Sequence, residues 1–100
     1  MSQPPATIAD RLAHILGVPT FIALGTAPET DSSPPTTYRF NLELKRLEFH
    51  DDVALTWRRS FHGDAIRKIF RGQRGTLLSA QGQWAYDALA AHGLLDQLAP

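Results

Sequence analysis

The sequence predicts a single small α+β domain, with an antiparallel sheet centred on a β-hairpin at about residues 37–59. Helices from the N- and C-terminal parts of the chain are expected on one face of this sheet. Three observations lead to this class: an apolar stripe at helical spacing near the N-terminus, alternating apolar residues in the middle, and an alanine-rich stretch near the end. A chain of 100 residues has the size of one domain and can bury one modest core. We therefore treat residues 1–100 as a single domain.

The first predicted helix covers residues 7–16 and ends before Gly17, a residue that commonly terminates helices. A short apolar run at residues 21–24, flanked by proline and glycine, predicts a buried strand. Residues 26–37 hold three prolines, many hydroxyl groups and no large apolar side chain. Such a segment cannot offset its ordering entropy by burial, so we expect an exposed, mobile loop. The helical stripe consists of Ile8, Leu12, Ile15 and Leu16.

The central segment gives the clearest strand signal. Apolar residues alternate with polar ones from Tyr38 to Leu44, and the alternation then shifts by one position. A β-bulge near residues 45–46 would return the later apolar residues to the same face. A turn is expected at residues 50–52, where histidine and two aspartates occur together. The predicted cross-strand pairs on the apolar face are Phe49 with Val53, Leu47 with Leu55, and Leu44 with Trp57.

Two further helices are predicted in the second half of the chain. The first covers residues 65–71, with Asp64 as its N-cap and Gly72 at its end. A short strand is expected at residues 76–78, and Ser79 then opens an alanine-rich helix. The buried side of this last helix is expected to hold Trp84, Ala88 and Ala91.

Charge is balanced over the whole chain, with ten cations and ten anions, but not over residues 57–75. This stretch carries six cations and one anion, Asp64. Clustered guanidinium groups suit bidentate contact with phosphate or carboxylate. The candidate binding residues are Arg58, Arg59, Arg67, Lys68, Arg71 and Arg74.

Two classes of function remain open for these residues. In the first, a non-enzymatic binding module or regulator uses the cationic patch to dock on a polyanion or a nucleic-acid-processing complex. The partner is then a nucleic acid or an acidic protein surface, and contacts to a nucleic-acid backbone would dominate because no base-reading set is visible. In the second, a protein–protein interaction module or inhibitor uses residues 26–37 and the alanine-rich helix, through which a homodimer could also form.

Catalytic and cofactor motifs are absent from the sequence. No serine lies in a GxSxG motif, and neither GxxxxGK[ST] nor GxGxxG occurs. The absence of cysteine excludes disulfides and thiolate metal sites. We therefore expect no catalytic residue, no cofactor and no metal. The remaining enzyme alternative is a metal-independent ribonuclease that uses His50 and His62 with nearby arginines.

No apolar run in the sequence approaches the roughly 18 residues that a membrane-spanning helix requires. The N-terminus also lacks the basic and then apolar pattern of a signal peptide. We expect a cytoplasmic protein that has no membrane partner.

Overall fold

The computed structural model describes residues 20–100 of the chain. The helix predicted at residues 7–16 lies outside the described residues. The described part contains four strands, two α-helices and one short 3₁₀ helix. These elements are β1 (Phe21–Ala27), β2 (Thr36–Asn41), β3 (Arg46–Asp51), β4 (Thr56–Arg59), α2 (His62–Phe70), α3 (Ala80–Ala91) and the 3₁₀ helix η1 (Leu95–Gln97).

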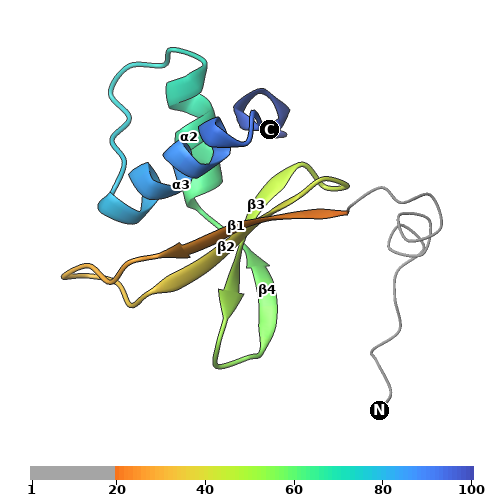
Figure 1. Ribbon diagram of the computed structural model, residues 1–100. Coiled ribbons are helices and arrows are strands. Elements are labelled where there is room, and N and C mark those ends of the chain that lie inside the picture. Colours follow the sequence, from red (N-terminus) through yellow and green to blue (C-terminus); the bar gives the residue numbers. More distant parts are fainter. Residues whose placement is uncertain (1–19) are drawn as a thin grey trace.

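The four strands form one antiparallel sheet in the order β1-β2-β3-β4. Each strand therefore pairs with the next one along the chain. Figure 1 shows α2 and α3 on the same side of the sheet, with the β3–β4 hairpin extending away from them. The predicted α+β class, with a hairpin at the centre of an antiparallel sheet, is confirmed.

The predicted strand register is wrong, because a turn and not a bulge follows β2. Phe49 pairs with Tyr38 on one side and with Arg58 on the other. None of the three predicted cross-strand pairs occurs in the described sheet. Val53 and Leu55 lie in the β3–β4 turn, where they are 95% and 77% exposed and contribute nothing to the core.

Both turns after β2 and β3 begin with the same hydrogen-bonded arrangement. Asn41 Oδ1 accepts hydrogen bonds from the N–H groups of the second and third residues after it, at 3.0 and 2.9 Å. Asp51 Oδ1 accepts the equivalent two bonds, both at 3.0 Å. Each turn ends in a left-handed residue, Lys45 with φ 55° and Leu55 with φ 54°. Asparagine and aspartate side chains stabilise turns in this way, so both turns form without glycine.

The core lies between the sheet and the two helices. Alternate residues of a strand point to the same face, so Tyr38 and Phe40 of β2 face the helices together. A register shift between Ala23 and Gly25 allows β1 to contribute as well. The core cluster consists of Leu24, Ala27, Tyr38, Phe40, Leu47, Ile66, Ala85, Leu89, Leu94 and Leu98.

α3 begins and ends where the sequence predicts. Ser79 is the N-cap, and its Oγ accepts a hydrogen bond from the N–H of Gly82 at 3.1 Å. Gly93 follows the end of the helix with φ 66°. The N–H of Leu94 then donates to the carbonyl of Leu89 at 2.9 Å, a pattern typical of helix ends with a left-handed glycine. This reversal carries Leu94 back into the core.

The buried side of α3 differs from the predicted one. Ala85 and Leu89 are fully buried, whereas Trp84 and Ala88 are half-buried and Ala91 is exposed. α3 lies against both β1 and α2, so its contact surface is centred between two neighbours. The spacing of apolar residues along α3 does not show which elements it packs against. The predicted buried side therefore differs from the observed one by a rotation about the helix axis.

One buried side chain ties the β1–β2 connection to α3. Gln81 Nε2 donates to the carbonyl of Pro34 at 2.7 Å and to that of Pro28 at 3.4 Å. Gln81 Oε1 accepts a hydrogen bond from the hydroxyl of Tyr38 at 2.9 Å. The ends of β1 and β2 include the outer residues of the predicted loop at 26–37, and its mobility stays a prediction.

Candidate docking surface

α2 carries two of the six candidate cations, Arg67 and Lys68, and Arg71 and Arg74 follow in the connection to α3. The helix begins at His62, whose N–H donates to Ser60 Oγ at 3.2 Å. The predicted N-cap, Asp64, therefore lies inside the first turn, where a carboxylate favours the partial positive charge of the helix end. Ile66 is the buried residue of α2, and Gly72 follows the helix with φ 79°. The predicted amphipathic helix thus forms, with its start moved to His62.

The two strand arginines of the predicted site are held in ion pairs. Arg58 Nε lies 2.7 Å from Asp51 Oδ2, and Arg59 Nη2 lies 2.8 Å from Asp64 Oδ1. Both arginine side chains are 55% exposed, and exposed pairs contribute only about 0–1 kcal/mol to stability. A bound polyanion would nevertheless have to compete with these carboxylates. Arg58 and Arg59 are therefore less available to such a ligand than cations without a carboxylate partner.

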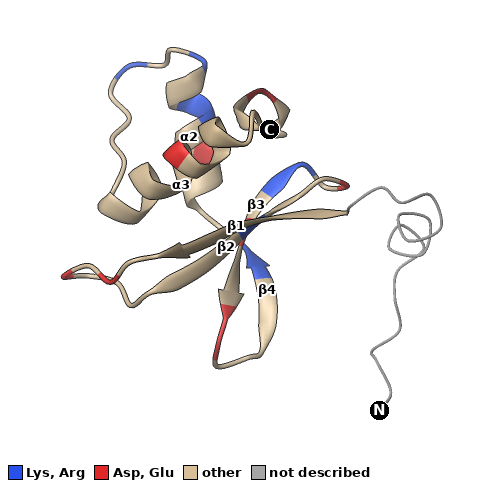
Figure 2. Ribbon diagram, in the orientation of Figure 1, with Lys and Arg blue, Asp and Glu red and all other residues tan. Residues whose placement is uncertain are grey.

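The other four predicted residues lie in the last turn of α2 and in the connection that follows it. Within residues 20–100, none of them has a carboxylate at ion-pair distance. Figure 2 shows their blue segments along the end of α2 and the start of the α2–α3 connection, away from β4. All are exposed except Arg67, which is half-buried. We call this set the cationic surface: Arg67, Lys68, Arg71 and Arg74.

Arg67 differs from the other members of the cationic surface. Its Nε atom is buried and has no hydrogen-bond partner in the described part of the chain. A buried donor without a partner costs about 1–3 kcal/mol, so replacing Arg67 would also change the stability of the fold. Lys68 and Arg71 are exposed and are the better positions for tests of binding.

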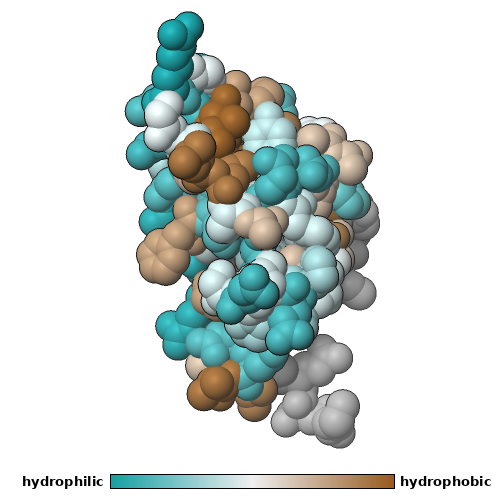
Figure 3. All heavy atoms as spheres, turned by 90° about the vertical axis from the view of Figure 1, so that its left-hand side faces the viewer, coloured by the Kyte–Doolittle hydropathy of each residue, from teal (hydrophilic) through white to brown (hydrophobic). Residues whose placement is uncertain are grey.

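A groove lies beside the cationic surface, between the end of α2, the α2–α3 connection and the first half of α3. Its volume is about 480 Å³. The strand predicted at residues 76–78 is not formed, and this irregular segment supplies one wall of the groove. Figure 3 shows apolar side chains gathered near the top of the molecule, beside projecting hydrophilic ones. We call this feature the α2–α3 groove, and its lining residues are Ile69, Thr76, Leu77, Leu78, Gln83 and Tyr86.

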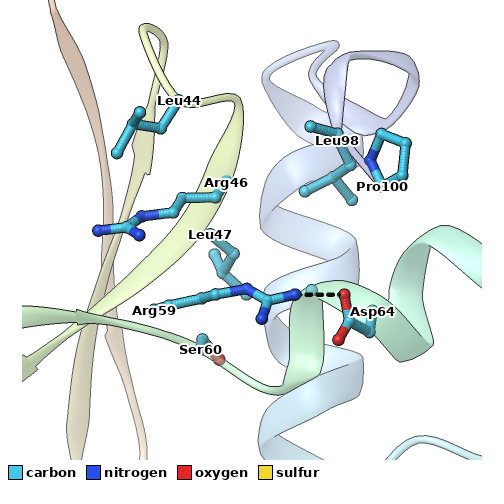
Figure 4. A pocket seen from close by; sticks show the side chains of 10 residues that line it. Leu44, Arg46, Leu47, Arg59, Ser60, Asp64, Leu98 and Pro100 are labelled. Carbon is cyan, nitrogen blue, oxygen red and sulfur yellow. Dashed lines mark hydrogen bonds and ion pairs between the residues drawn. The ribbon is translucent and has the colours of Figure 1, made fainter.

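A second pocket, of about 300 Å³, lies between the β2–β3 turn, the end of β4 and the last residues of the chain (Figure 4). Two guanidinium groups line it, and each has a carboxylate partner. Arg46 Nη2 lies 2.6 Å from Glu48 Oε2, and Arg59 is paired with Asp64 as described above. Both guanidinium groups of this pocket are therefore held in ion pairs, and the pocket is not part of the cationic surface.

The sheet face opposite the helices holds a cluster that sequence reasoning missed. The strand pairing places Arg39, Glu48 and Trp57 on this face, although Trp57 was expected in the core. The guanidinium carbon of Arg39 lies 3.7 Å from the ring centroid of Phe21 and 4.3 Å from that of Trp57. The available signal was Asn41, because an asparagine-initiated turn there changes which residues share a face.

Glu48 is the anion of this cluster and is only 1% exposed. It accepts hydrogen bonds from Arg39 Nε at 2.8 Å and from Arg46 Nε at 2.7 Å. Burial alone would raise the pKa of Glu48, but the hydrogen bonds and charges of the two arginines outweigh burial and hold the pKa below its usual value. The carboxylate therefore stays ionised at neutral pH and anchors both arginines to the sheet.

The two histidines of the enzyme alternative face opposite sides of the sheet. His50 pairs with Trp57 on the face of Glu48, and its Nδ1 lies 2.6 Å from Asp52 Oδ1. His62 packs against the ring of Tyr38 on the core side, with centroids 6.2 Å apart. Burial lowers the pKa of His62, which favours the neutral imidazole. The fold thus does not bring these two side chains together as an acid–base pair.

Among residues 20–100 there is no cluster of three or more histidine, aspartate or glutamate side chains arranged to hold a metal ion. The helices in this range are also too short or too polar to cross a membrane.

Comparison of the chain with protein-family models, curated proteins and solved structures gave no match.

Proposed function

We propose that the protein is a non-enzymatic binding module or small regulator whose cationic surface docks on a polyanion. The observation that carries this proposal is the exposure of Lys68, Arg71 and Arg74 together, with no carboxylate at ion-pair distance among residues 20–100. Guanidinium groups suit both phosphate and carboxylate ligands. The polyanion is accordingly a nucleic acid, alone or within a complex that processes it, or an acidic protein surface.

The proposal is supported by the positive charge of the cationic surface and not by the net charge of the chain. The chain as a whole has a formal net charge of zero, so long-range attraction of polyanions is weak. Within about one Debye length, roughly 8 Å at physiological ionic strength, the cationic surface acts on its own. Binding should therefore be short-ranged and sensitive to salt.

The proposal predicts that Lys68→Glu and Arg71→Glu each weaken binding of a DNA duplex or of poly-glutamate by about tenfold, a loss of about 1.4 kcal/mol. Each change removes one attraction and adds one repulsion at an exposed position. Fluorescence anisotropy of labelled probes over a range of salt concentrations measures the effect. Affinity should fall with salt, because each neutralised phosphate releases a bound counterion.

Lys45→Glu is the matched control, because it makes the same charge change at an exposed lysine in the β2–β3 turn. Its effect on binding should stay within about twofold. A salt-independent affinity, or equal effects of Lys68→Glu and Lys45→Glu, would show that the cationic surface is not the docking site.

The α2–α3 groove favours a second candidate: a protein–protein interaction module or inhibitor that makes no contact with nucleic acid. Leu77, in the wall of this groove, is 91% exposed. Contact with a phosphate backbone would leave this apolar side chain exposed to water, whereas contact with a protein could bury it. We include in the proposal a cytoplasmic location and a homodimer formed through α3. Cell fractionation and sedimentation at several protein concentrations test these two points separately.

A further inference from the structure

We propose that the α2–α3 groove binds an acidic amphipathic segment of a partner protein. Apolar side chains of the segment would enter the groove, and its carboxylates would meet the cationic surface. This inference rests on the proposed function, because it names the polyanion as a protein segment. The interaction is a helix-in-groove contact, in which apolar anchors recur along one face of the bound helix.

The groove has a solvent-exposed apolar surface that no segment of residues 20–100 covers. Leu77, in the wall of the groove, is 91% exposed. Ile69, Leu78 and Tyr86 line the same groove. Its volume of about 480 Å³ lies within the range of about 300–1,000 Å³ that is typical of ligand pockets.

Cations that lie close to the groove in sequence favour an acidic partner. Lys68 directly precedes Ile69, and the connection that carries Arg71 and Arg74 continues into the wall formed by Leu77. On the α3 side, the one charged neighbour of the lining residues in sequence is Asp87, which accepts a hydrogen bond from Gln83 at 3.0 Å. The cations outnumber this acid, so a partner with carboxylates gains and a basic partner is repelled.

The end of α2 does not cancel these cations. The last carbonyls of a helix carry partial negative charge. Here the carbonyl of Ile69 accepts from Gly72 and that of Lys68 accepts from Gln73, both at 2.9 Å. Hydrogen bonding of these carbonyls leaves Arg71 and Arg74 available to an external anion.

A protein segment fits the groove better than a nucleic acid or a lipid surface. Contact with phosphates would leave Leu77 in water, because the nucleic-acid backbone offers no apolar surface. Binding to a membrane requires a continuous apolar face that enters the lipid, whereas Thr76 and Gln83 interrupt the apolar lining of this groove. These two polar side chains can donate hydrogen bonds to peptide carbonyls or to side chains of a bound segment.

The test uses the full chain and a labelled synthetic peptide of about 16 residues, long enough to form a helix in water. The peptide carries leucines at helical spacing between glutamates, and a second peptide has the same composition with its leucines out of phase. Leu77→Asn should weaken binding of the first peptide by about tenfold or more, as measured by anisotropy. Val53→Asn is the matched control, because Val53 is a 95% exposed apolar residue in the β3–β4 turn, and its effect should stay within about twofold.

The outcomes separate this inference from the proposed function. If Lys68→Glu weakens peptide binding and Leu77→Asn does not, the groove inference is wrong and the proposed function stands. If Leu77→Asn weakens binding and Lys68→Glu does not, the groove binds apolar segments without charge selection, and both proposals are wrong as stated. Equal binding of the two peptides overturns the inference, as does tighter, Leu77-dependent binding of a DNA duplex or of phosphatidylserine vesicles.

Discussion

At the scale of single residues, Glu48 shows how this small sheet accommodates a buried charge. Its carboxylate is enclosed by Arg39 and Arg46, and Arg39 is in turn packed over two aromatic rings. A buried charge is tolerated only when it is paired and hydrogen-bonded. The two arginines meet this condition from β2 and β3, so the cluster also links the two central strands.

Glu48→Gln should lower the free energy of unfolding by about 2–3 kcal/mol at neutral pH, because it leaves two arginines without their anion. This loss of stability is at or below the low end of the cost of breaking a buried ion pair, because the side chains of Arg39 and Arg46 are 20% and 37% exposed. Urea denaturation measures the change. Glu43→Gln, at an exposed position in the β2–β3 turn, should change stability by less than about 0.5 kcal/mol. Equal losses in the two variants would contradict a stabilising role for the cluster.

The lowered pKa of Glu48 also predicts how stability depends on pH. Because the folded state holds this carboxylate ionised, its contribution is fully present above the unfolded pKa of about 4.3. It is lost as pH falls through the lower, folded pKa, where the unfolded chain has already bound its proton. Below about pH 4 the wild type should therefore lose stability more steeply than Glu48→Gln. Parallel slopes for the two proteins would show that another group governs this range.

At the scale of elements, the two turns that begin at Asn41 and Asp51 decide which residues share a face. Each turn holds four residues and ends in the left-handed region, at Lys45 and Leu55. Residues other than glycine, asparagine and aspartate pay about 1–2 kcal/mol for that conformation. The hydrogen bonds from the Asx side chains stabilise both turns in spite of this cost.

Leu55→Gly should raise the free energy of unfolding by about 0.5–1 kcal/mol, because glycine adopts a positive φ without steric conflict. Its loss of conformational entropy on folding offsets part of this gain. Val53→Gly tests the same turn at a position without a positive φ, and it should lower stability. Thermal unfolding followed by circular dichroism compares the two. A loss of stability in Leu55→Gly would mean that its side chain makes a contribution larger than the backbone cost.

The elements also show which features the sequence could predict. The start of α3 at Ser79 and its end near Gly93 depend on neighbours within one helical turn, and both were predicted. The amphipathic character of α2 was predicted for the same reason. The pairing of Arg58 with Asp51 could not be, because it depends on the register set by the second turn. The α2–α3 groove depends on how two helices meet, which spacing within either helix does not determine.

At the scale of the whole molecule, the sheet and the helices share one core. Ile66, Ala85 and Leu89 from the helices belong to the same buried cluster as Phe40 and Leu47 from the strands. Separate unfolding of either layer would expose the apolar face of the other. Small domains with one shared core usually unfold in a single cooperative transition.

The two tryptophans can test this cooperativity, because they lie on different sides of the sheet. Trp84 packs against the core from α3, and Trp57 lies with Arg39 on the opposite face. In Trp57→Phe and Trp84→Phe, the fluorescence of the remaining tryptophan should report the same urea midpoint as circular dichroism of that variant. An earlier fluorescence change in Trp84→Phe would show that the β3–β4 hairpin opens before the rest of the fold.

β4 is an edge strand of the described sheet, and its unpaired backbone groups could pair with a strand from another molecule. It is only four residues long, TWRR, and half of it is arginine. Short, charged edge strands are poor templates for such intermolecular strand pairing. We therefore expect that replacing Arg58 and Arg59 with uncharged β-branched residues would make the protein more prone to aggregate through β4.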